Sequence, residues 1–387
     1  MPSSSRRGTL AGIDTYIVKT VEWCNLNCKY CYFYNSQDTS WMERPRFMSP
    51  LIFDKVVENI RQHCIEKDIS KVWIVFHGGE PTLQPLAQFD EMVQKAETLR
   101  ADGIEVVYKV TTNATLLNDE WAERFARFKF NVGVSLDGPK ELNDSMRVNK
   151  AGRGSYDQVV RGLELAQKYV GRGLNLGTIS VLNPAIDGDA VYRHLRSLNI
   201  QNINLVLPEA NYVQEPLPVR PGYGYFELMR DIFDAWIEED NSKVNIRLFA
   251  DMIRAVSGLT FASDQFGYAP VNVAVIETDG DLQPTDNFRA CEDRMSDLGL
   301  NVLRNSMDDL YMDPFFSYCR EQQDIIPKAC KDCKFLAICG GGRVTTRFSR
   351  EEGFARRTIY CNDLYRMFDH IERVLTSRGV ATQYSNA

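Results

Sequence analysis

The sequence lacks any hydrophobic run long enough to cross a membrane, because no apolar stretch among its 387 residues approaches the roughly 18–20 residues that a spanning helix needs. It also lacks an excess of basic residues: 45 Lys and Arg face 52 Asp and Glu, which leaves a net charge of −7. That balance gives no footprint for nucleic acid or for an anionic membrane surface. Two arginines near the start have no apolar core after them, so we expect residues 1–14 to form a short disordered lead and not a signal peptide. These absences predict a cytoplasmic protein.

The composition is otherwise that of an ordinary globular protein, with 44% hydrophobic and 25% charged residues. The length allows one large α/β domain and a smaller second domain. Ten cysteines are present. In a reducing compartment they point to metal ligation or catalysis instead of disulfides.

Six short runs of apolar and β-branched residues alternate with helical patterns in the first two hundred residues or so. This alternation is typical of βα units, which build a parallel sheet, and right-handed crossovers wrap such a sheet into a barrel. We therefore expect an α/β fold with a partial, TIM-like (β/α)6 barrel. The expected strands are 15–21, 72–76, 104–110, 131–135, 174–181 and 203–207. The expected helices begin at Pro50 and continue at 89–99, 120–128, 156–170 and 189–198.

A charged, Pro-rich stretch at 209–221 interrupts this rhythm, and helical patterns resume at 226–239 and 249–258. We assign 15–258 to the barrel domain, with 209–258 as a loop and helical bridge. Residues 259–387 differ in composition, with short strands, Gly/Asp turns and six of the ten cysteines, and they predict a second, α+β domain. Its closing helix should pack on the core through an apolar stripe at helical spacing, formed by Leu364, Phe368, Ile371 and Leu375.

Three cysteines near the N-terminus, Cys24, Cys28 and Cys31, follow the first expected strand. A tight loop with this spacing can direct three thiolates to one centre. Thiolates hold iron–sulfur clusters, and a cubane with four irons would keep one iron open for chemistry. The alternative is a structural zinc site, which usually has four ligands in paired elements. No histidine or fourth cysteine lies close by in the sequence, since Cys64 falls inside the first helical pattern.

This cysteine loop, with an aromatic residue before its last cysteine, resembles the signature of the radical SAM superfamily. The resemblance implies a [4Fe–4S] cluster and S-adenosylmethionine. Later loops match the family in order: HGGEP at 77–81, TTN at 111–113, SLDG at 135–138, and an arginine that in relatives holds the cofactor carboxylate. The residues expected to bind S-adenosylmethionine are Tyr30, Gly78, Gly79, Glu80, Asn113, Ser135, Asp137 and Arg147. Local loop capping is the alternative role of the Asn, Ser and Asp, and a solvated surface position that of the arginine.

The second domain carries Cys330, Cys333 and Cys339, followed by glycines at 340–342 and then by Cys361. This pattern resembles the SPASM extension of radical SAM enzymes, whose four cysteines ligate an auxiliary [4Fe–4S] cluster. The glycines could turn backbone amides toward the cluster sulfides. A zinc knot is the alternative, because zinc also accepts four thiolates.

A second auxiliary cluster, as in some relatives, would need further ligands. Cys291 and Cys319 are candidates, but the short upstream cysteine pair of the family is missing, and Arg343 stands where a further cysteine would lie. The two cysteines could hold a partial cluster with other ligands or be plain buried thiols. The sequence leaves both possibilities open.

Nearly the whole chain is similar to peptide maturases that crosslink ribosomally made precursors, of which the best-known members form three-residue cyclophanes by joining an aromatic ring carbon to a β-carbon. Anaerobic sulfatase maturases are close cousins. The alternatives are therefore formylglycine formation or another peptide oxidation or epimerisation, and, in another class, a zinc-binding scaffold. The expected partners are a precursor peptide and an electron donor such as flavodoxin or ferredoxin. No winged peptide-recognition domain is expected.

The resemblance implies a defined course of reaction. A 5′-deoxyadenosyl radical abstracts a side-chain hydrogen, ring closure releases an electron and a proton, and the auxiliary cluster accepts the electron. A poised carboxylate would accept the proton. The candidates in the sequence are Glu209 and Asp281.

Overall fold

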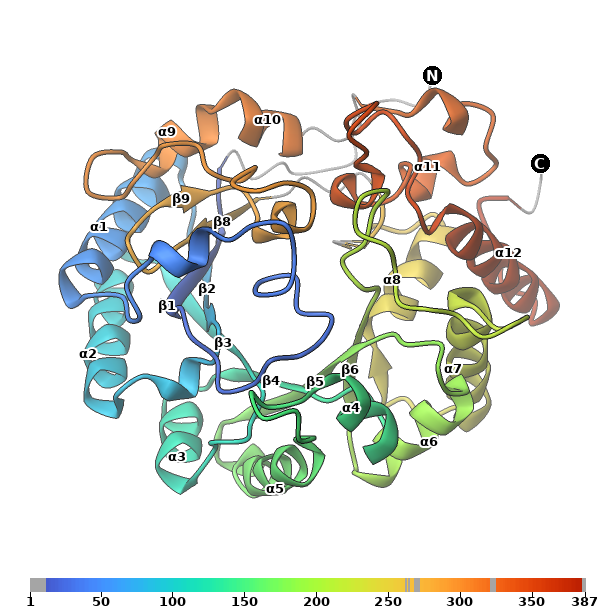
Figure 1. Cartoon of the computed structure of the whole chain (residues 1–387), viewed down its shortest axis with the longest axis horizontal. Coiled ribbons are helices and arrows are strands. Elements are labelled where there is room, and N and C mark those ends of the chain that lie inside the picture. Colours follow the sequence, from blue (N-terminus) through green and yellow to red (C-terminus); the bar gives the residue numbers. More distant parts are fainter. Residues whose placement is uncertain (1–11, 262, 264, 268–271, 321–324, 385–387) are drawn as a thin grey trace.

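The computed structural model describes residues 12–261, 263, 265–267, 272–320 and 325–384. Its centre is one curved sheet with the strand order β7-β6-β5-β4-β3-β2-β1-β8-β9, and helices surround the sheet (Figure 1). Neighbouring strands are parallel except for the antiparallel pair β8–β9. The strands are β1 (Thr15–Val21), β2 (Lys71–Gly78), β3 (Glu105–Thr112), β4 (Asn131–Ser135), β5 (Asn175–Val181), β6 (Asn202–Val206), β7 (Asn245–Ile246), β8 (Val273–Ile276) and β9 (Leu282–Gln283).

The α-helices lie between and after these strands. They are α1 (Pro50–Lys67), α2 (Leu86–Glu97), α3 (Asp119–Arg127), α4 (Lys140–Met146), α5 (Tyr156–Gln167), α6 (Gly188–Ser197), α7 (Tyr225–Glu239), α8 (Arg247–Val256), α9 (Met307–Met312), α10 (Pro314–Arg320), α11 (Leu336–Cys339) and α12 (Cys361–Ser377). Ser49 caps α1 by accepting a hydrogen bond from the Ile52 amide, and Pro50 occupies the first turn, where its missing N–H costs nothing.

The alternation of side chains along each strand decides which residues reach the interior of the barrel. In β2, Val72, Ile74 and Phe76 are buried, whereas Trp73, Val75 and His77 are not fully buried. Successive side chains of a strand point to opposite faces. The first set packs beneath the helices: Phe76 lies 5.2 Å, centroid to centroid, from Phe89 of α2. The second set, which includes His77, faces the inside.

The six expected strands of the barrel are confirmed, with bounds that differ by a few residues. The partial barrel is larger than expected, because β7, β8 and β9 extend its sheet at both ends. These strands are only two to four residues long, too short to give a periodic pattern. The sheet continues through β8, which pairs with β1, so the expected boundary at residue 258 is not a break in the sheet.

The expected disordered lead falls largely outside the described residues, which begin at Gly12. The expectation of disorder is wrong for its last part, residues 12–14. Ile13 is completely buried, and its amide donates to Nε2 of His63 in α1. An apolar side chain directly before the first strand adds to the core, and this anchors the chain there.

The closing helix α12 packs against α7 and α8. All four residues of its expected apolar stripe are buried: Leu364, Phe368, Ile371 and Leu375. Among the described residues, no helix combines the length and the hydrophobicity that a membrane crossing requires.

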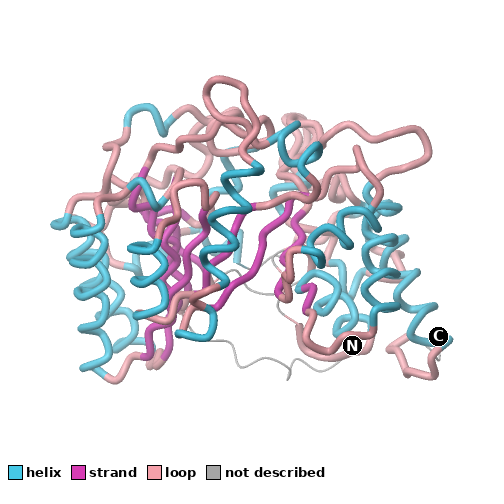
Figure 2. Tube along the Cα trace, turned by 90° about the horizontal axis from the view of Figure 1, so that it is seen from below, coloured by secondary structure: helices cyan, strands magenta, loops and turns pink. Residues whose placement is uncertain are grey.

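Because the strands β1 to β6 are parallel, their carboxyl ends meet at one edge of the sheet. Long loops gather at that edge, which is the upper one in Figure 2. Barrel active sites form at this edge. The residues expected to hold the first cluster and to bind S-adenosylmethionine lie at these strand ends or in the loops after them, so the fold brings them together.

Candidate active site

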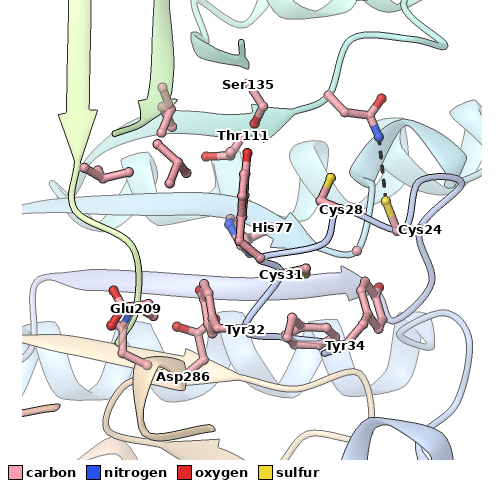
Figure 3. Close-up of a pocket in the computed structure, with 18 of the residues that line it drawn as sticks. Cys24, Cys28, Cys31, Tyr32, Tyr34, His77, Thr111, Ser135, Glu209 and Asp286 are labelled. Carbon is pink, nitrogen blue, oxygen red and sulfur yellow. Dashed lines mark hydrogen bonds between the residues drawn. The ribbon is translucent and has the colours of Figure 1, made fainter. Parts of the chain in front are cut away.

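A cavity of about 370 Å³ opens at the carboxyl ends of the strands. The cysteine loop and the loops after β2, β3 and β4 line one part of it, and side chains of β5 and β6 line another. Figure 3 shows the thiols of Cys24, Cys28 and Cys31 near the loop residues, with Tyr32, Glu209 and Asp286 at some distance from them. The cavity thus has a thiol end and an opposite end.

The three thiols are free and half-buried, and the loop that carries them is tightly turned. The amide of Cys31 donates to the Cys28 carbonyl over 2.9 Å, and the Leu26 amide donates to Sγ of Cys24 over 3.4 Å. Burial raises the pKa of Cys24 to about 12 and that of Cys28 to about 11. A bound metal centre would reverse this, because a coordinating thiol loses its proton.

Gly78 and Gly79, two of the residues expected to bind S-adenosylmethionine, are required by the cysteine loop itself. A Cβ on Gly79 would lie 2.2 Å from the Trp23 carbonyl, and one on Gly78 would lie 2.0 Å from the Val21 carbonyl. The backbones are joined there, since the Gly79 amide donates to Val21 over 2.8 Å. The glycines therefore fix the position of the cysteine loop on the sheet.

Glu80, one of the residues expected to bind S-adenosylmethionine, lines the cavity. Its carboxylate is 1% exposed and already accepts four hydrogen bonds, from the amides of Thr82 and Asn113 and from the hydroxyls of Thr82 and Thr112. Burial raises the pKa of Glu80, and these donors oppose the shift. Glu80 thus ties the loop after β2 to the end of β3.

Asp137 and Arg147 form a buried ion pair, with Nη2 of the arginine 3.0 Å from Oδ1 of the aspartate. The Tyr30 hydroxyl donates to the other oxygen of Asp137, and the amide of Val181 donates to Oδ1. Asp137, one of the residues expected to bind S-adenosylmethionine, therefore has both carboxylate oxygens in contact with protein groups. Arg147 also lines the cavity, and its charge and a side-chain hydrogen bond to Cys28 oppose the burial that raises the pKa of that thiol.

Asn113 and Ser135 also line the cavity, after β3 and at the end of β4. Asn113 Nδ2 donates to Oδ1 of Asn25 over 2.9 Å and lies 3.7 Å from Sγ of Cys24. The loop after β3 is therefore joined to the thiol end of the cavity. This joint brings together residues that are ninety positions apart in the sequence.

Comparison with known proteins now adds the decisive observation. The sequence profile of the radical SAM superfamily matches residues 18–194, the segment that carries the thiols, both glycines and the Asp137–Arg147 pair. Residues 18–194 form a radical SAM domain. The chain is therefore an enzyme, and the family implies a [4Fe–4S] cluster and S-adenosylmethionine as cofactors.

Known proteins resemble the chain beyond this domain. It is similar to a cysteine-type anaerobic sulfatase-maturating enzyme of Clostridium perfringens, with 25% identity over 364 residues, 90% of this chain and 93% of the relative. Its structure resembles native anSMEcpe with bound AdoMet and Cp18Cys peptide, with a TM-score of 0.80, 22% identity and coverage of 95% and 99%. It also resembles Streptococcus suis SuiB bound to precursor peptide SuiA, with a TM-score of 0.57, 18% identity and coverage of 91% and 76%. At these identities the two structures show a shared fold.

The residues of the radical SAM domain fit a cluster with one open iron. Three free thiols and the buried Arg147 line one cavity. Nowhere in the described ranges do three His, Cys, Asp or Glu side chains surround a single ion position. A cubane is larger than one zinc ion, so its thiolate ligands need not meet at a single ion position.

Outside the radical SAM domain, four thiols come together as the sequence analysis expects. Cys330, Cys333, Cys339 and Cys361 line one pocket of about 20 Å³. Burial, and to a lesser extent the neighbouring thiols, raise the pKa of Cys339 to about 12, whereas a backbone hydrogen bond from Gly341 opposes the shift. That bond shows one glycine of the GGG turn with its amide directed at a thiol.

Cys291 and Cys319 lie in a separate apolar cluster with Phe288, Val344 and Phe348. The thiol of Cys291 is completely buried and donates to the Thr345 carbonyl over 3.6 Å. Burial raises the pKa of both thiols. The geometry favours plain buried thiols over a partial second cluster.

The two carboxylates expected as proton acceptors have different positions. Glu209 lines the cavity and pairs with Arg343. The expectation that Asp281 accepts a proton in the site is wrong, because Asp281 does not line the cavity. Its carboxylate lies 3.1 Å from Nη1 of Arg44 and accepts a hydrogen bond from Asn301. The antiparallel pairing of β8 and β9 reverses the chain, and this turns Asp281 away from the site.

Sequence reasoning missed Asp286 and His77, which both line the cavity. Asp286 lies five residues after Asp281, in the turn that follows β9 and leads back toward the barrel. Its Oδ2 lies 3.2 Å from Nζ of Lys19. His77 was part of the HGGEP motif, but the motif gave it no separate role. The period of two along β2 could have placed its side chain inside the barrel.

Proposed function

We propose that this enzyme modifies a ribosomally made precursor peptide and forms an oxidative C–C crosslink between an aromatic ring carbon and a β-carbon. The class of enzyme and the kind of substrate rest on the relatives. The chain is a radical SAM enzyme, and it resembles a sulfatase-maturating enzyme and structures with bound peptides. The single observation that carries the proposal is the apolar lining of the cavity beside its thiol end. Its thiol end adjoins a wall of Ile179, Val181 and Leu207, which can receive an apolar side chain of a peptide.

When bound, the cluster and S-adenosylmethionine supply a 5′-deoxyadenosyl radical that abstracts a hydrogen atom. Cys24, Cys28 and Cys31 would hold this cluster, and Arg147, which lines the same cavity, would pair with the cofactor carboxylate. Asn113 and Ser135 line the same end and can donate to ribose hydroxyls. The backbone bonds of Gly79 and the four hydrogen bonds of Glu80 hold these loops in place.

Cys330, Cys333, Cys339 and Cys361 would hold an auxiliary [4Fe–4S] cluster, which supplies a centre that can accept an electron. Tyr360, directly before Cys361, donates from its hydroxyl to the Pro208 carbonyl over 2.9 Å. Pro208 and its neighbour Glu209 line the cavity. The auxiliary site is therefore joined to the cavity wall by one buried side chain. We place the reaction in the cytoplasm, with a flavodoxin or ferredoxin as the electron donor.

A second candidate is formylglycine formation in a sulfatase, which the resemblance to the Clostridium perfringens enzyme favours. Against it stands the Glu209–Arg343 ion pair, which occupies the place where the pattern of the family has a further cysteine. The apolar surroundings of Cys291 and Cys319 add to this. These differences favour a peptide-crosslinking role.

The test is incubation of the anaerobically reconstituted enzyme with the peptide encoded by the short reading frame beside its gene. A crosslink lowers the peptide mass by two hydrogens and suppresses backbone fragmentation between the joined residues. Formylglycine from serine also removes two hydrogens, but it leaves an aldehyde that reacts with a hydrazide probe. Epimerisation leaves the mass unchanged. The Cys24→Ala variant is the matched control and should yield only unmodified peptide.

A further inference from the structure

His77 is the last residue of β2 before Gly78, and its side chain faces the inside of the barrel. It lines the cavity, and Figure 3 shows it between the thiol end and the end with Tyr32 and Asp286. In the sheet it stands beside Lys19, its register partner on β1. His77 therefore lies where a substrate side chain that enters from the end opposite the thiols would meet the cofactor.

The imidazole of His77 has no structural duty that the described residues reveal. Its Nδ1 is sealed from solvent and has no hydrogen-bond partner among them. A buried polar atom without a partner costs free energy, and its persistence in a cavity points to a functional role. Since Nδ1 is sealed, Nε2 is the nitrogen that a molecule in the cavity can reach.

The charges around His77 keep it neutral and ready to accept a proton. Burial lowers its pKa from the ordinary value near 6.5; Asp286 and Glu277 raise it, and Lys19 lowers it. Asp286 is a poor proton acceptor by comparison. Despite its burial, the nearby charge of Lys19 helps to lower the pKa of Asp286 to about 2. A general base works best when its pKa lies near the working pH, which favours the imidazole over this carboxylate.

We propose that His77 is the general base of the crosslinking step. The role rests on the proposed function. The carboxylate of Asp286, which lines the same cavity, favours the protonated form of His77. After hydrogen abstraction, the β-carbon radical bonds to a ring carbon, which still carries its hydrogen. The ring then loses one electron to an iron–sulfur cluster and one proton to Nε2 of His77, and aromaticity returns. Together with the abstracted hydrogen atom, the peptide loses two protons and two electrons, which equals the two hydrogens missing from the product.

The experiment compares wild type, His77→Gln and His194→Gln with the peptide of the neighbouring reading frame, or with synthetic peptides that place an aromatic residue two positions from each other residue type in turn. His194 is also half-buried with a lowered pKa, but it lies on α6, away from the cavity. We expect His77→Gln to lower the rate of crosslinking about 100-fold, within the range that general bases contribute. The wild-type rate should fall at acid pH, with a midpoint below the ordinary histidine pKa near 6.5, and His77→Gln should lose this acid limb.

Cleavage of S-adenosylmethionine and iron content, measured in the same samples, report on the fold and the cluster. A His77→Gln enzyme that crosslinks at the wild-type rate with the same acid limb overturns the role, and so does one that loses cleavage in parallel. Asp286→Asn should still crosslink, with the acid limb at lower pH, because it removes a negative charge near His77. Complete loss with Asp286→Asn would make the carboxylate the acceptor. A wild-type enzyme that cleaves the cofactor but changes no peptide mass contradicts the proposed function itself.

Discussion

The two thiol sites of this chain differ in how their ligands are assembled. Cys24, Cys28 and Cys31 lie on one loop, and all three line the large cavity. The four thiols of the second site come from the segment around Cys330 and Cys333, the last residue of α11 and the first residue of α12, and they line a pocket of about 20 Å³. The first site has about 370 Å³ of space beside it, whereas the second has almost none.

This difference shows how the path of the chain determines whether a thiol site stays open to a substrate or is enclosed. One loop can present three thiolates to a centre, but it covers only one side of that centre, so the other side faces the cavity. Segments that arrive from different directions can enclose a group completely. An open position is where a metal centre performs chemistry, and a closed ligand set serves structure or electron transfer.

The largest expected effect tests the open site. Replacing Cys24, Cys28 or Cys31 by Ala should lower cleavage of S-adenosylmethionine at least about 100-fold, since even supporting groups at metal sites are worth 10–100-fold. Formation of 5′-deoxyadenosine after dithionite reduction measures it. The buried Cys64 of α1, replaced by Ala, is the control. Cleavage that survives in any of the three variants would contradict the assignment of the open site, because the loop would then not hold the reacting cluster.

A smaller effect tests the closed site. Cys330→Ala or Cys339→Ala should remove about four irons per chain and should retain cleavage of S-adenosylmethionine. Turnover of peptide should fall at least about tenfold, as expected for a group that supports the reaction. Iron analysis and peptide mass measure the two quantities.

Cys291→Ala and Cys319→Ala sharpen this second test, because both thiols lie in the apolar cluster and not at the closed site. Their iron content should equal that of wild type. Loss of iron in either variant would show that these cysteines also ligate a cluster, contrary to their packing.

The smallest effect comes from a residue far from both sites. Glu239, at the end of α7, accepts hydrogen bonds from Arg196 and Tyr192, and these lower its pKa to about 2. A lowered folded-state pKa stabilises the fold above about pH 4.5, and this contribution is lost as the pH falls toward 2. Glu239→Gln should cost about 1 kcal/mol at pH 7 and less at pH 3, as measured by denaturant unfolding. Iron content should not change; a change would mean that global stability, and not ligand geometry, sets cluster occupancy.

The sequence by itself determined the local features of this protein. The spacing of 24–31 and of 330–339 determined where thiols gather, because ligands a few residues apart on a tight loop share one centre whatever the rest of the fold does. The alternation of strand and helical patterns determined the barrel, and the stripe of α12 determined its buried face. Each signal depends on neighbours within about two helical turns.

Only the tertiary structure decided which polar side chains face the cavity and which serve the scaffold. Glu80 is occupied by donors from the end of β3, and Asp137 by Arg147 and Tyr30. Asp281 and Asp286 are five positions apart, yet the β8–β9 reversal sends one to Arg44 and the other to Lys19 beside the cavity. The physical reason is that a carboxylate takes the nearest donor or cation in space. In a parallel sheet those partners come from distant parts of the chain.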